Sequence, residues 1–259
     1  MWENELKAAI EAGKIAKEKI LEIYHQKFAV EIKSDNSPVT IADKTADKII
    51  RDYLHEKFPT HAFLTEESED DVSRLQNDFV WIVDPVDGTK DFVAKDDQFT
   101  TNIALSYKHK LVVGVVIAPA LDEIYFASEN NGAFFQKSQQ KPVKIHVNDK
   151  INDLTVLTSV FHFNDDEKAL IEKHKDRITN VMKRGSSLKP CAIAHGLAEI
   201  TYRMSPNTKE WDTAACQIIL EEAGGLFVKP DGSPITYNRV DVYNREGYIA
   251  VNRKENILL

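Results

Sequence analysis

The segment Trp81-Ile82-Val83-Asp84-Pro85-Val86-Asp87-Gly88-Thr89 carries the densest chemistry of the chain. Its apolar start predicts a buried strand that ends at Asp84. The proline fixes φ and the glycine frees the turn, so Asp84 and Asp87 can converge beyond the strand end. The carbonyl of Val86 lies between them and adds a neutral oxygen. These oxygen donors suit a hard cation such as Mg²⁺ better than zinc, because neither His nor Cys stands near them.

Carboxylates also stand at predicted element ends in three other segments. Glu66 follows a short apolar run, Asp212 begins a predicted helix, and Asp43 lies in the first turn of a helix with Thr40 as its N-cap. Each has a simpler explanation, Glu66 as part of a solvated acidic run and Asp212 and Asp43 as helix caps, and the loop from Asp84 to Gly88 could by itself be a surface turn. Bringing two carboxylates to ~4 Å costs on the order of 4 kcal/mol at an effective dielectric of about 20, so a folded cluster would need cations. If the four segments meet, we expect two or three Mg²⁺ ions and a docking place for phosphate.

The residues after the two aspartates favour phosphate as the ligand. Gly88 and Thr89 begin a predicted short helical turn, whose free N–H groups could receive phosphate oxygens. Phosphoryl transfer to water depends on metal charge, an oriented water and an in-line leaving group. Glu66 and Thr89, with Asp43 behind them, could orient that water.

The hydrophobic pattern predicts an α+β chain. Helical spacing is found over residues 6–24, 40–58, 165–174, 190–197 and 211–223. Strands are predicted at 29–33, before a turn over 34–38, and at 62–65, 79–83, 102–107, 112–117, 124–127, 154–159, 198–203, 226–229 and 248–251. Tight turns between neighbouring strands favour a largely antiparallel sheet. A boundary between residues 140 and 155, without a flexible linker, indicates two packed subdomains.

Composition narrows the function classes. The 259 residues are 42% apolar, enough for one large domain or two smaller ones with a substantial core. A formal charge of −8 argues against a nucleic-acid partner bound through a broad cationic face. Two cysteines are too few for a disulfide framework and suit a reducing cytosol. The acidic N-terminus and the lack of an 18-residue apolar run lead us to expect a soluble, cytoplasmic protein without membrane association.

Three motifs together resemble a known superfamily, the lithium-sensitive, magnesium-dependent phosphatases that include inositol monophosphatases and 3′(2′),5′-bisphosphate nucleotidases. The motifs are residues 63–68 (FLTEES), 81–89 (WIVDPVDGT) and 211–215 (WDTAA), the last followed by Gly224-Gly225. Their order and spacing match, and the resemblance covers nearly the whole chain. It implies a layered αβαβα sandwich of the inositol monophosphatase and sugar phosphatase type. The expected subdomains are 1–148, with most metal ligands, and 149–259, with Asp212 and a substrate-binding segment.

The resemblance also implies roles for individual residues. The metal ligands it implies are Glu66, Asp84, the Val86 carbonyl, Asp87 and Asp212. Water activation is implied for Glu66, Thr89 and Asp43, and substrate contact for Gly88, Thr89 and Asp212. Haloacid dehalogenase phosphatases instead place one residue between their two aspartates, whereas two residues separate Asp84 from Asp87 here, which disfavours that superfamily.

Two segments favour the nucleotidase branch. Residues 90–92 read Lys-Asp-Phe, close to the Lys-Glu-Phe of bacterial bisphosphate nucleotidases, whereas inositol monophosphatases usually have a variable residue, Asn and Phe. Residues 185–189 resemble the nucleotidase pattern in which Ser and Lys face the substrate. Ser186, Ser187 and Lys189 could therefore neutralise and hydrogen-bond a second phosphate.

These observations predict a phosphoric monoester hydrolase that removes the 3′-phosphate of adenosine 3′,5′-bisphosphate through metal-activated water, giving AMP and phosphate. An inositol monophosphatase or broad sugar phosphatase is the alternative. A non-catalytic scaffold that binds metal or nucleotide is a third, less favoured because every matched metal position keeps its carboxylate. The resemblance further implies inhibition by Li⁺ and a role in sulfur metabolism. The oligomeric state is left open between a monomer and a homodimer.

Overall fold

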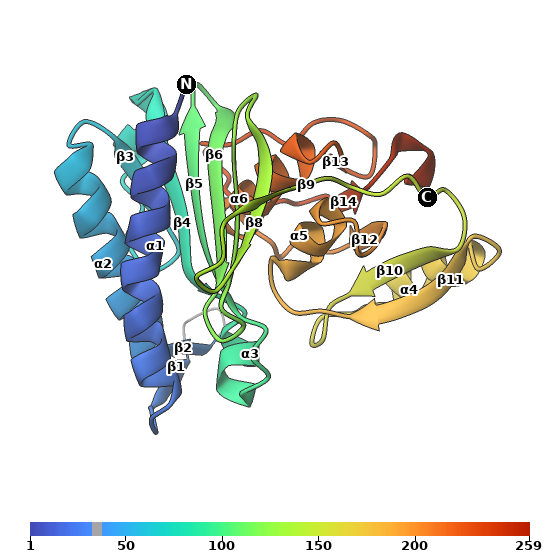
Figure 1. The fold of residues 1–259 in the computed structure, drawn as a ribbon, viewed down its shortest axis with the longest axis horizontal. Coiled ribbons are helices and arrows are strands. Elements are labelled where there is room, and N and C mark those ends of the chain that lie inside the picture. Colours follow the sequence, from blue (N-terminus) through green and yellow to red (C-terminus); the bar gives the residue numbers. More distant parts are fainter. Residues whose placement is uncertain (33–37) are drawn as a thin grey trace.

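The structure, a computed structural model, describes residues 1–32 and 38–259. Helices and sheets alternate in five layers (Figure 1). This arrangement is the αβαβα sandwich that the sequence resemblance implied. The turn predicted over 34–38 falls, up to Ser37, outside the described residues, as does Lys33 at the end of the strand predicted before it.

The first layer consists of two long helices, α1 (Glu3–Tyr24) and α2 (Ile41–Lys57), both predicted from their apolar spacing. A two-stranded ribbon, β1 (Val30–Ile32) and β2 (Pro38–Thr40), leads into α2. The predicted cap of α2 is confirmed: Thr40 Oγ1 accepts from the Ala42 N–H, and Asp43 Oδ2 accepts from the Thr40 N–H at 2.8 Å. This exchange fixes Asp43 at the start of the helix.

The second layer is a seven-stranded sheet in which β3 and β4 are parallel and every other neighbouring pair is antiparallel, as the tight turns predicted. Its strands, in chain and spatial order, are β3 (Ala62–Thr65), β4 (Phe79–Asp87), β5 (Thr100–Tyr107), β6 (Lys110–Ala118), β7 (Glu123–Ser128), β8 (Gly132–Lys137) and β9 (Val143–Ile145). The last two were not predicted. In β8 only one residue is fully buried, and β9 has three residues, so neither shows a readable alternation.

Alternation along β4 explains how the sheet separates two cores. Trp81 and Val83 pack toward α1 and α2, whereas Val80 and Ile82 pack toward the helices of the third layer. All four side chains are at most 1% exposed. A central strand with two apolar faces belongs between helices, and the burial of both faces stabilises the sandwich.

The third layer contains α5 (Leu188–Ala194) and α6 (Glu210–Glu222), which pack against each other and on the sheet. Gly114 in β6 allows the close approach of α6, because a Cβ at this position would stand 2.6 Å from the Ala215 carbonyl oxygen. The helix α6 is followed by Gly224 with a φ of +93°, a backbone angle that favours glycine. A short helix, α3 (Thr89–Ala94), follows β4 as predicted.

The fourth layer is a five-stranded mixed sheet, which α4 (Asp165–Lys173) covers as the fifth layer (Figure 1). Its strands, in spatial order, are β11 (Ile178–Lys183), β10 (Leu154–Thr158), β12 (Ile200–Arg203), β14 (Tyr248–Val251) and β13 (Leu226–Val228). The edge strand β11 was not predicted, because five of its six residues are exposed. Two single-turn helices, η1 (Val72–Gln76) and η2 (Lys254–Asn256), complete the elements of the described residues.

The first large sheet ends at Ile145 and the second begins at Leu154. Between them Asn148 is anchored, because its amide nitrogen donates to Glu199 Oε1 at 2.6 Å. We keep the division into residues 1–148 and 149–259 as a proposal. Within the described residues, each helix is too short or too polar to cross a lipid bilayer.

Candidate active site

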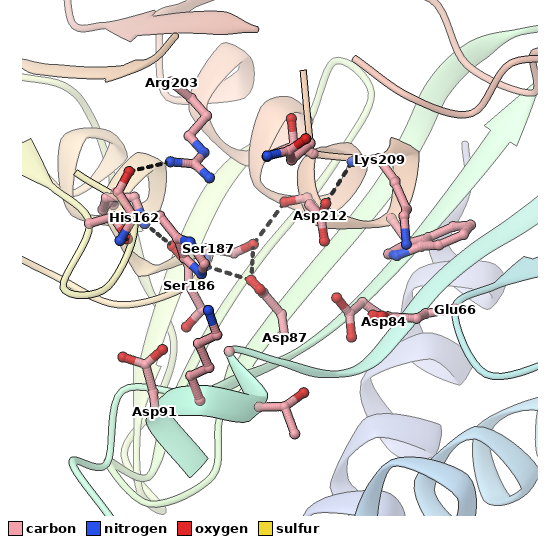
Figure 2. A pocket seen from close by; sticks show the side chains of 18 of the residues that line it. Glu66, Asp84, Asp87, Asp91, His162, Ser186, Ser187, Arg203, Lys209 and Asp212 are labelled. Carbon is pink, nitrogen blue, oxygen red and sulfur yellow. Dashed lines mark hydrogen bonds between the residues drawn. The ribbon is translucent and has the colours of Figure 1, made fainter. Parts of the chain in front are cut away.

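Three carboxylates from different elements meet at one end of the first large sheet. The strand β3 ends beside Val83 of the parallel strand β4, and the Glu66 N–H donates to the Val83 carbonyl at 3.2 Å. Asp212 reaches the same place from the first turn of α6. One oxygen each of Glu66, Asp84 and Asp212 lies within 4.8 Å of the others (Figure 2). The structure thus brings together three of the predicted metal ligands.

The strand β4 continues past the end that the sequence predicted. It runs to Asp87, with a register irregularity between Asp84 and Asp87. The proline is tolerated because the partner β3 has already ended, so no ladder bond is lost on that side. Its carbonyl instead accepts from Thr101 Oγ1 at 2.9 Å. The irregularity turns the chain, so that Asp84 and Asp87 can both face the site.

Asp84 has a buried carboxylate oxygen that a bound cation could coordinate. The residue is 1% exposed, and its Oδ1 accepts from the Val86 N–H at 3.1 Å. Its Oδ2 is buried, and no donor among the described residues reaches it. Burial raises the pKa of Asp84 well above its ordinary value, and the charge of Glu66 raises it further. Because the surrounding donors are oxygens, the residues present fit a hard divalent ion such as Mg²⁺.

Asp212 occupies a different helix position from the one predicted. It was expected to begin the helix, but it is the third residue of α6, whose N-cap is Lys209. Its Oδ2 accepts from the Lys209 N–H at 2.6 Å. Removal from solvent raises the pKa of Asp212 to about 8, and the charges of Asp87 and Glu66 contribute. The capping bond therefore orients the carboxylate without cancelling the repulsion around it.

Asp87 lies beside the three clustered carboxylates, and hydrogen bonds from neighbouring residues hold its side chain in place. Its Oδ2 accepts from the Ser187 N–H and Oγ, both at 2.8 Å, and from Asn102 Nδ2 at 3.2 Å. Thr100 Oγ1 lies 3.3 Å from the same oxygen. These four contacts all reach Oδ2, so they fix the carboxylate through one of its two oxygens.

Thr89, which follows β4, contacts Asp43 at the start of α2. Its Oγ1 lies 3.2 Å from Asp43 Oδ1 and 3.3 Å from the Val86 carbonyl oxygen. Asp43 is 2% exposed, and burial raises its pKa above the ordinary value. Gly88 precedes Thr89 with a φ of +84°, and a Cβ there would approach Ser186 at 3.3 Å. The glycine thus lets the loop close against the predicted substrate segment.

The predicted substrate residues line the same cavity but also bind protein atoms. Ser187 Oγ lies 3.0 Å from the Asp212 carbonyl oxygen, in addition to its contact with Asp87. Ser186 Oγ donates to the carbonyl of Gln98. Lys189 is 6% exposed, and its Nζ donates to the Ser186 carbonyl at 2.7 Å. These side chains therefore shape the wall of the cavity in this structure.

The cavity has a volume of about 470 Å³ and a second end with cationic side chains, among them Arg203, which was not one of the predicted site residues. Arg203 and His162 lie there, far from Glu66 and Asp84 (Figure 2). Arg203 Nη1 donates to the His162 carbonyl at 2.7 Å. Partial removal from solvent lowers the pKa of His162 to about 4, and three cationic side chains lower it further, those of Lys90, Arg203 and Lys189.

Known proteins with similar sequences and structures identify the family of this chain. The sequence profile of the inositol monophosphatase family matches residues 1–257. The chain is 35% identical to the 3′(2′),5′-bisphosphate nucleotidase CysQ of Buchnera aphidicola, covering 96% of this chain and 95% of that protein. It is 33% identical to inositol monophosphatase 2 of Solanum lycopersicum, in a match that covers 95% of this chain and 97% of that protein. The crystal structure of CysQ from Bacteroides thetaiotaomicron superposes with a TM-score of 0.86 at 33% identity, covering 98% and 99%. This chain belongs to the inositol monophosphatase family.

Proposed function

We propose that this protein is a Mg²⁺-dependent 3′(2′),5′-bisphosphate nucleotidase that converts adenosine 3′,5′-bisphosphate to AMP and phosphate. The observation that carries the proposal is a single cavity with a carboxylate cluster at one end and cationic side chains at the other. A substrate with two phosphates needs both ends, whereas a monophosphate needs only the first. The CysQ relatives, whose name states this activity, support the same choice.

The carboxylate end would hold two or three Mg²⁺ ions. The proposed ligands are Glu66, Asp84, Asp87, Asp212 and the Val86 carbonyl oxygen. When bound, Mg²⁺ supplies Lewis acidity and makes a water molecule more acidic. The backbone N–H groups of Gly88 and Thr89, at the start of α3, would donate to the oxygens of the same phosphate.

The proton of the attacking water would pass to protein oxygens at the base of the cluster. Thr89 Oγ1 can accept a hydrogen bond from that water while donating its own proton to Asp43 Oδ1, 3.2 Å away. Burial raises the pKa of Asp43, which makes its carboxylate a better proton acceptor than an ordinary aspartate. Glu66 would hold the water from the other side.

The cationic end would receive the second phosphate. Arg203 can present its guanidinium to phosphate oxygens, and Lys90 adds a nearby positive charge. Because its pKa is lowered, His162 is neutral at pH 7 and would serve as a hydrogen-bonding group. Ser186 and Ser187 lie between His162 and Asp87 (Figure 2), and we keep both, with Lys189, as proposed substrate contacts along the wall.

A phosphate-release panel tests the proposal. We expect adenosine 3′,5′-bisphosphate to be turned over with a kcat/KM at least about tenfold above that of inositol 1-phosphate or fructose 1,6-bisphosphate, and EDTA to abolish release. Preference for inositol 1-phosphate would support the alternative function, an inositol monophosphatase, which is the activity in the name of the Solanum lycopersicum relative. Failure to release phosphate from any of these esters with Mg²⁺ would support a binding scaffold. We further propose a cytoplasmic location and a state of either monomer or homodimer.

A further inference from the structure

A hydrogen-bond network with buried Arg74, Asn238 and Glu210 at its centre joins the loop after β3, which carries Glu66, to the first turn of α6, which carries Asp212. Its members are Asp70, Arg74, Asn238, Arg239 and Glu210, called here the Arg74–Glu210 network. Asp70 follows Glu66 by four residues, and Glu210 precedes Asp212 by two. None of the five is among the residues that line the cavity. The network therefore stands behind the site, in a place where it can act on the site without touching substrate.

Arg74 is the centre of the network on the side of Glu66. Its side chain is 1% exposed. Nε and Nη2 donate to the two carboxylate oxygens of Asp70 at 2.6 and 2.8 Å, which is the fork geometry of a strong arginine–carboxylate pair. Nη1 donates to Asn238 Oδ1 at 2.7 Å, and Nη2 donates to the Arg239 carbonyl at 3.1 Å. Arg74 thus joins the loop after β3 to a segment of the C-terminal half.

Glu210, in the same helical turn as Asp212, binds the same segment of the chain, residues 238 and 239. Its carboxylate is fully buried and accepts the N–H groups of Asn238 at 2.6 Å and Arg239 at 2.8 Å. Arg239 Nε adds a third bond at 3.2 Å. A buried carboxylate with this many donors is rigidly placed, and it sits in the first turn of α6 together with Asp212.

The clustered carboxylates need such a connection because they repel one another. Glu66 and Asp84 are placed by adjacent, hydrogen-bonded strands. Asp212 comes from α6 in a different layer. Without a bound cation, the repulsion favours moving α6 away from the strand ends, which would widen the separation that a shared cation bridges.

We propose that Arg74 and Glu210 are positioning residues that hold Asp212 at metal-bridging distance from Glu66 and Asp84. The inference rests on the proposed function only in that the carboxylates hold Mg²⁺. Replacing residues that hydrogen-bond to metal ligands commonly alters metal affinity by about 10–100-fold, and residues one step further from the ligands, such as these two, should act at the lower end of that range. Loss of either residue should therefore weaken Mg²⁺ binding more than it weakens substrate binding.

The test measures Mg²⁺ binding to the substrate-free protein, from the rise of the thermal unfolding midpoint during a Mg²⁺ titration. We expect Arg74→Met and Glu210→Gln each to raise the Mg²⁺ midpoint about tenfold, while KM for the bisphosphate at saturating Mg²⁺ stays within about twofold. Arg74→Lys, which keeps the charge but loses the fork, should give a smaller shift. The double variant should be little worse than either single one, because both break the same connection.

Arg177→Met is the matched control. Arg177 donates to Asn256 Oδ1 at 2.7 Å and to the Ile151 carbonyl at 2.6 Å, so its loss also breaks an arginine link between distant segments, but away from the cluster. It should lower the unfolding temperature and leave the Mg²⁺ midpoint unchanged. Equal Mg²⁺ midpoints for wild type, Arg74→Met and Glu210→Gln would overturn the proposal. If Arg74→Met does not fold, Glu210→Gln, which preserves side-chain volume, decides alone. Wild-type turnover of the bisphosphate tests the proposed function separately, since Mg²⁺ binding does not depend on which ester is hydrolysed.

Discussion

At the scale of single residues, the hydroxyl of Thr89 has the clearest chemical assignment. It can give its proton to Asp43 or to the Val86 carbonyl, and its lone pairs can accept from a water molecule. Replacement by Val keeps the shape of the side chain and removes the hydroxyl. We therefore expect Thr89→Val to lower kcat by about 10²–10³-fold with little change in KM, measured by phosphate release at saturating Mg²⁺.

Thr89→Ser is the control for this prediction, because it restores the hydroxyl without the methyl group. It should retain kcat within about tenfold of wild type. A Ser variant as slow as the Val variant would mean that Thr89 acts through its packing, and the relay to Asp43 would be wrong.

In the proposed function, Arg203 is the residue that should separate recognition of two phosphates from recognition of one. Its guanidinium lies at the cationic end of the cavity and pairs with Glu167 at 3.7 Å. Arg203→Met should raise KM for adenosine 3′,5′-bisphosphate by about tenfold or more, because the proposed contact of the guanidinium with phosphate would be lost. KM for a monophosphate ester should stay nearly unchanged in steady-state assays.

Lys189→Met provides the comparison. The sequence predicted that Lys189 contacts the second phosphate, whereas in the structure its Nζ already donates to the Ser186 carbonyl. A selective rise of KM for the bisphosphate would support direct contact. Equal rises of KM for both esters would mean that Lys189 supports the structure of the cavity wall instead. If neither Arg203→Met nor Lys189→Met raised KM selectively for the bisphosphate, the proposed cationic end would be contradicted.

The residues that sequence could and could not identify differ in a physical way. Asp84, Asp87 and Thr89 stand in one short segment, where proline, glycine and carboxylates together indicate a ligand-binding turn. Arg203 ends an ordinary strand, and nothing in its neighbours along the chain shows that folding places it opposite the carboxylates. Such a residue is found only once the two sheets are positioned relative to each other.

At the scale of elements, predictability follows burial. The helix α1 and the strand β4 were predicted because each buries a regular set of side chains, at helical spacing or on both faces. The strand β11 was missed because its exposed side chains carry no such pattern, and its place is set by parallel pairing with β10. Tertiary pairing, rather than local preference, makes it a strand.

The contact between α6 and β6 leads to a prediction at this scale. A Cβ at Gly114 would stand 2.6 Å from the Ala215 carbonyl oxygen and 2.4 Å from Ile218 Cγ2, so Gly114→Ala must push α6 away from the sheet. We expect a loss of about 1–3 kcal/mol in the free energy of unfolding, measured by urea denaturation. Because α6 carries Asp212, the Mg²⁺ midpoint should rise as well.

Gly13→Ala is the matched control on the opposite face of the same sheet. The new Cβ would meet Ile117 Cδ1, the mobile tip of a side chain, at 2.5 Å, and alanine favours the helix over glycine by about 1 kcal/mol. Its unfolding free energy should stay within about 1 kcal/mol of wild type, with an unchanged Mg²⁺ midpoint. Equal effects of the two substitutions would contradict a specific role for the α6 contact.

At the scale of the whole molecule, the site exists only because the layers are stacked. Glu66 and Asp84 come from the second layer and Asp212 from the third, and folding brings their negative charges together. The chain as a whole is also acidic, with a formal charge of −8. Protons or cations must therefore compensate the cluster in the folded protein, and the two should compete.

This competition predicts how stability depends on pH. The pKa of Asp212 rises from 3.8 to about 8 on folding, first through removal from solvent. A group whose pKa is raised contributes stability that is complete below pH 4 and is lost as the pH rises through about 8. In EDTA, the contribution of Asp212 to the unfolding temperature should therefore decrease as the pH rises from 4 to about 8. With Mg²⁺, the stabilisation by the metal should grow over the same range, because fewer protons must be displaced.

Asp212→Asn isolates this contribution from other titrating groups, because it removes the charge and keeps the side-chain shape. Unfolding temperatures of wild type and variant, measured at pH 5, 6.5 and 8 with EDTA or Mg²⁺, provide the check. In EDTA the variant should gain on wild type as the pH rises, and with Mg²⁺ it should lose the stabilisation that wild type shows. If wild type gained on the variant toward pH 8 in EDTA, Asp212 would be ionised at little cost, and repulsion within the cluster could not be what the cation relieves.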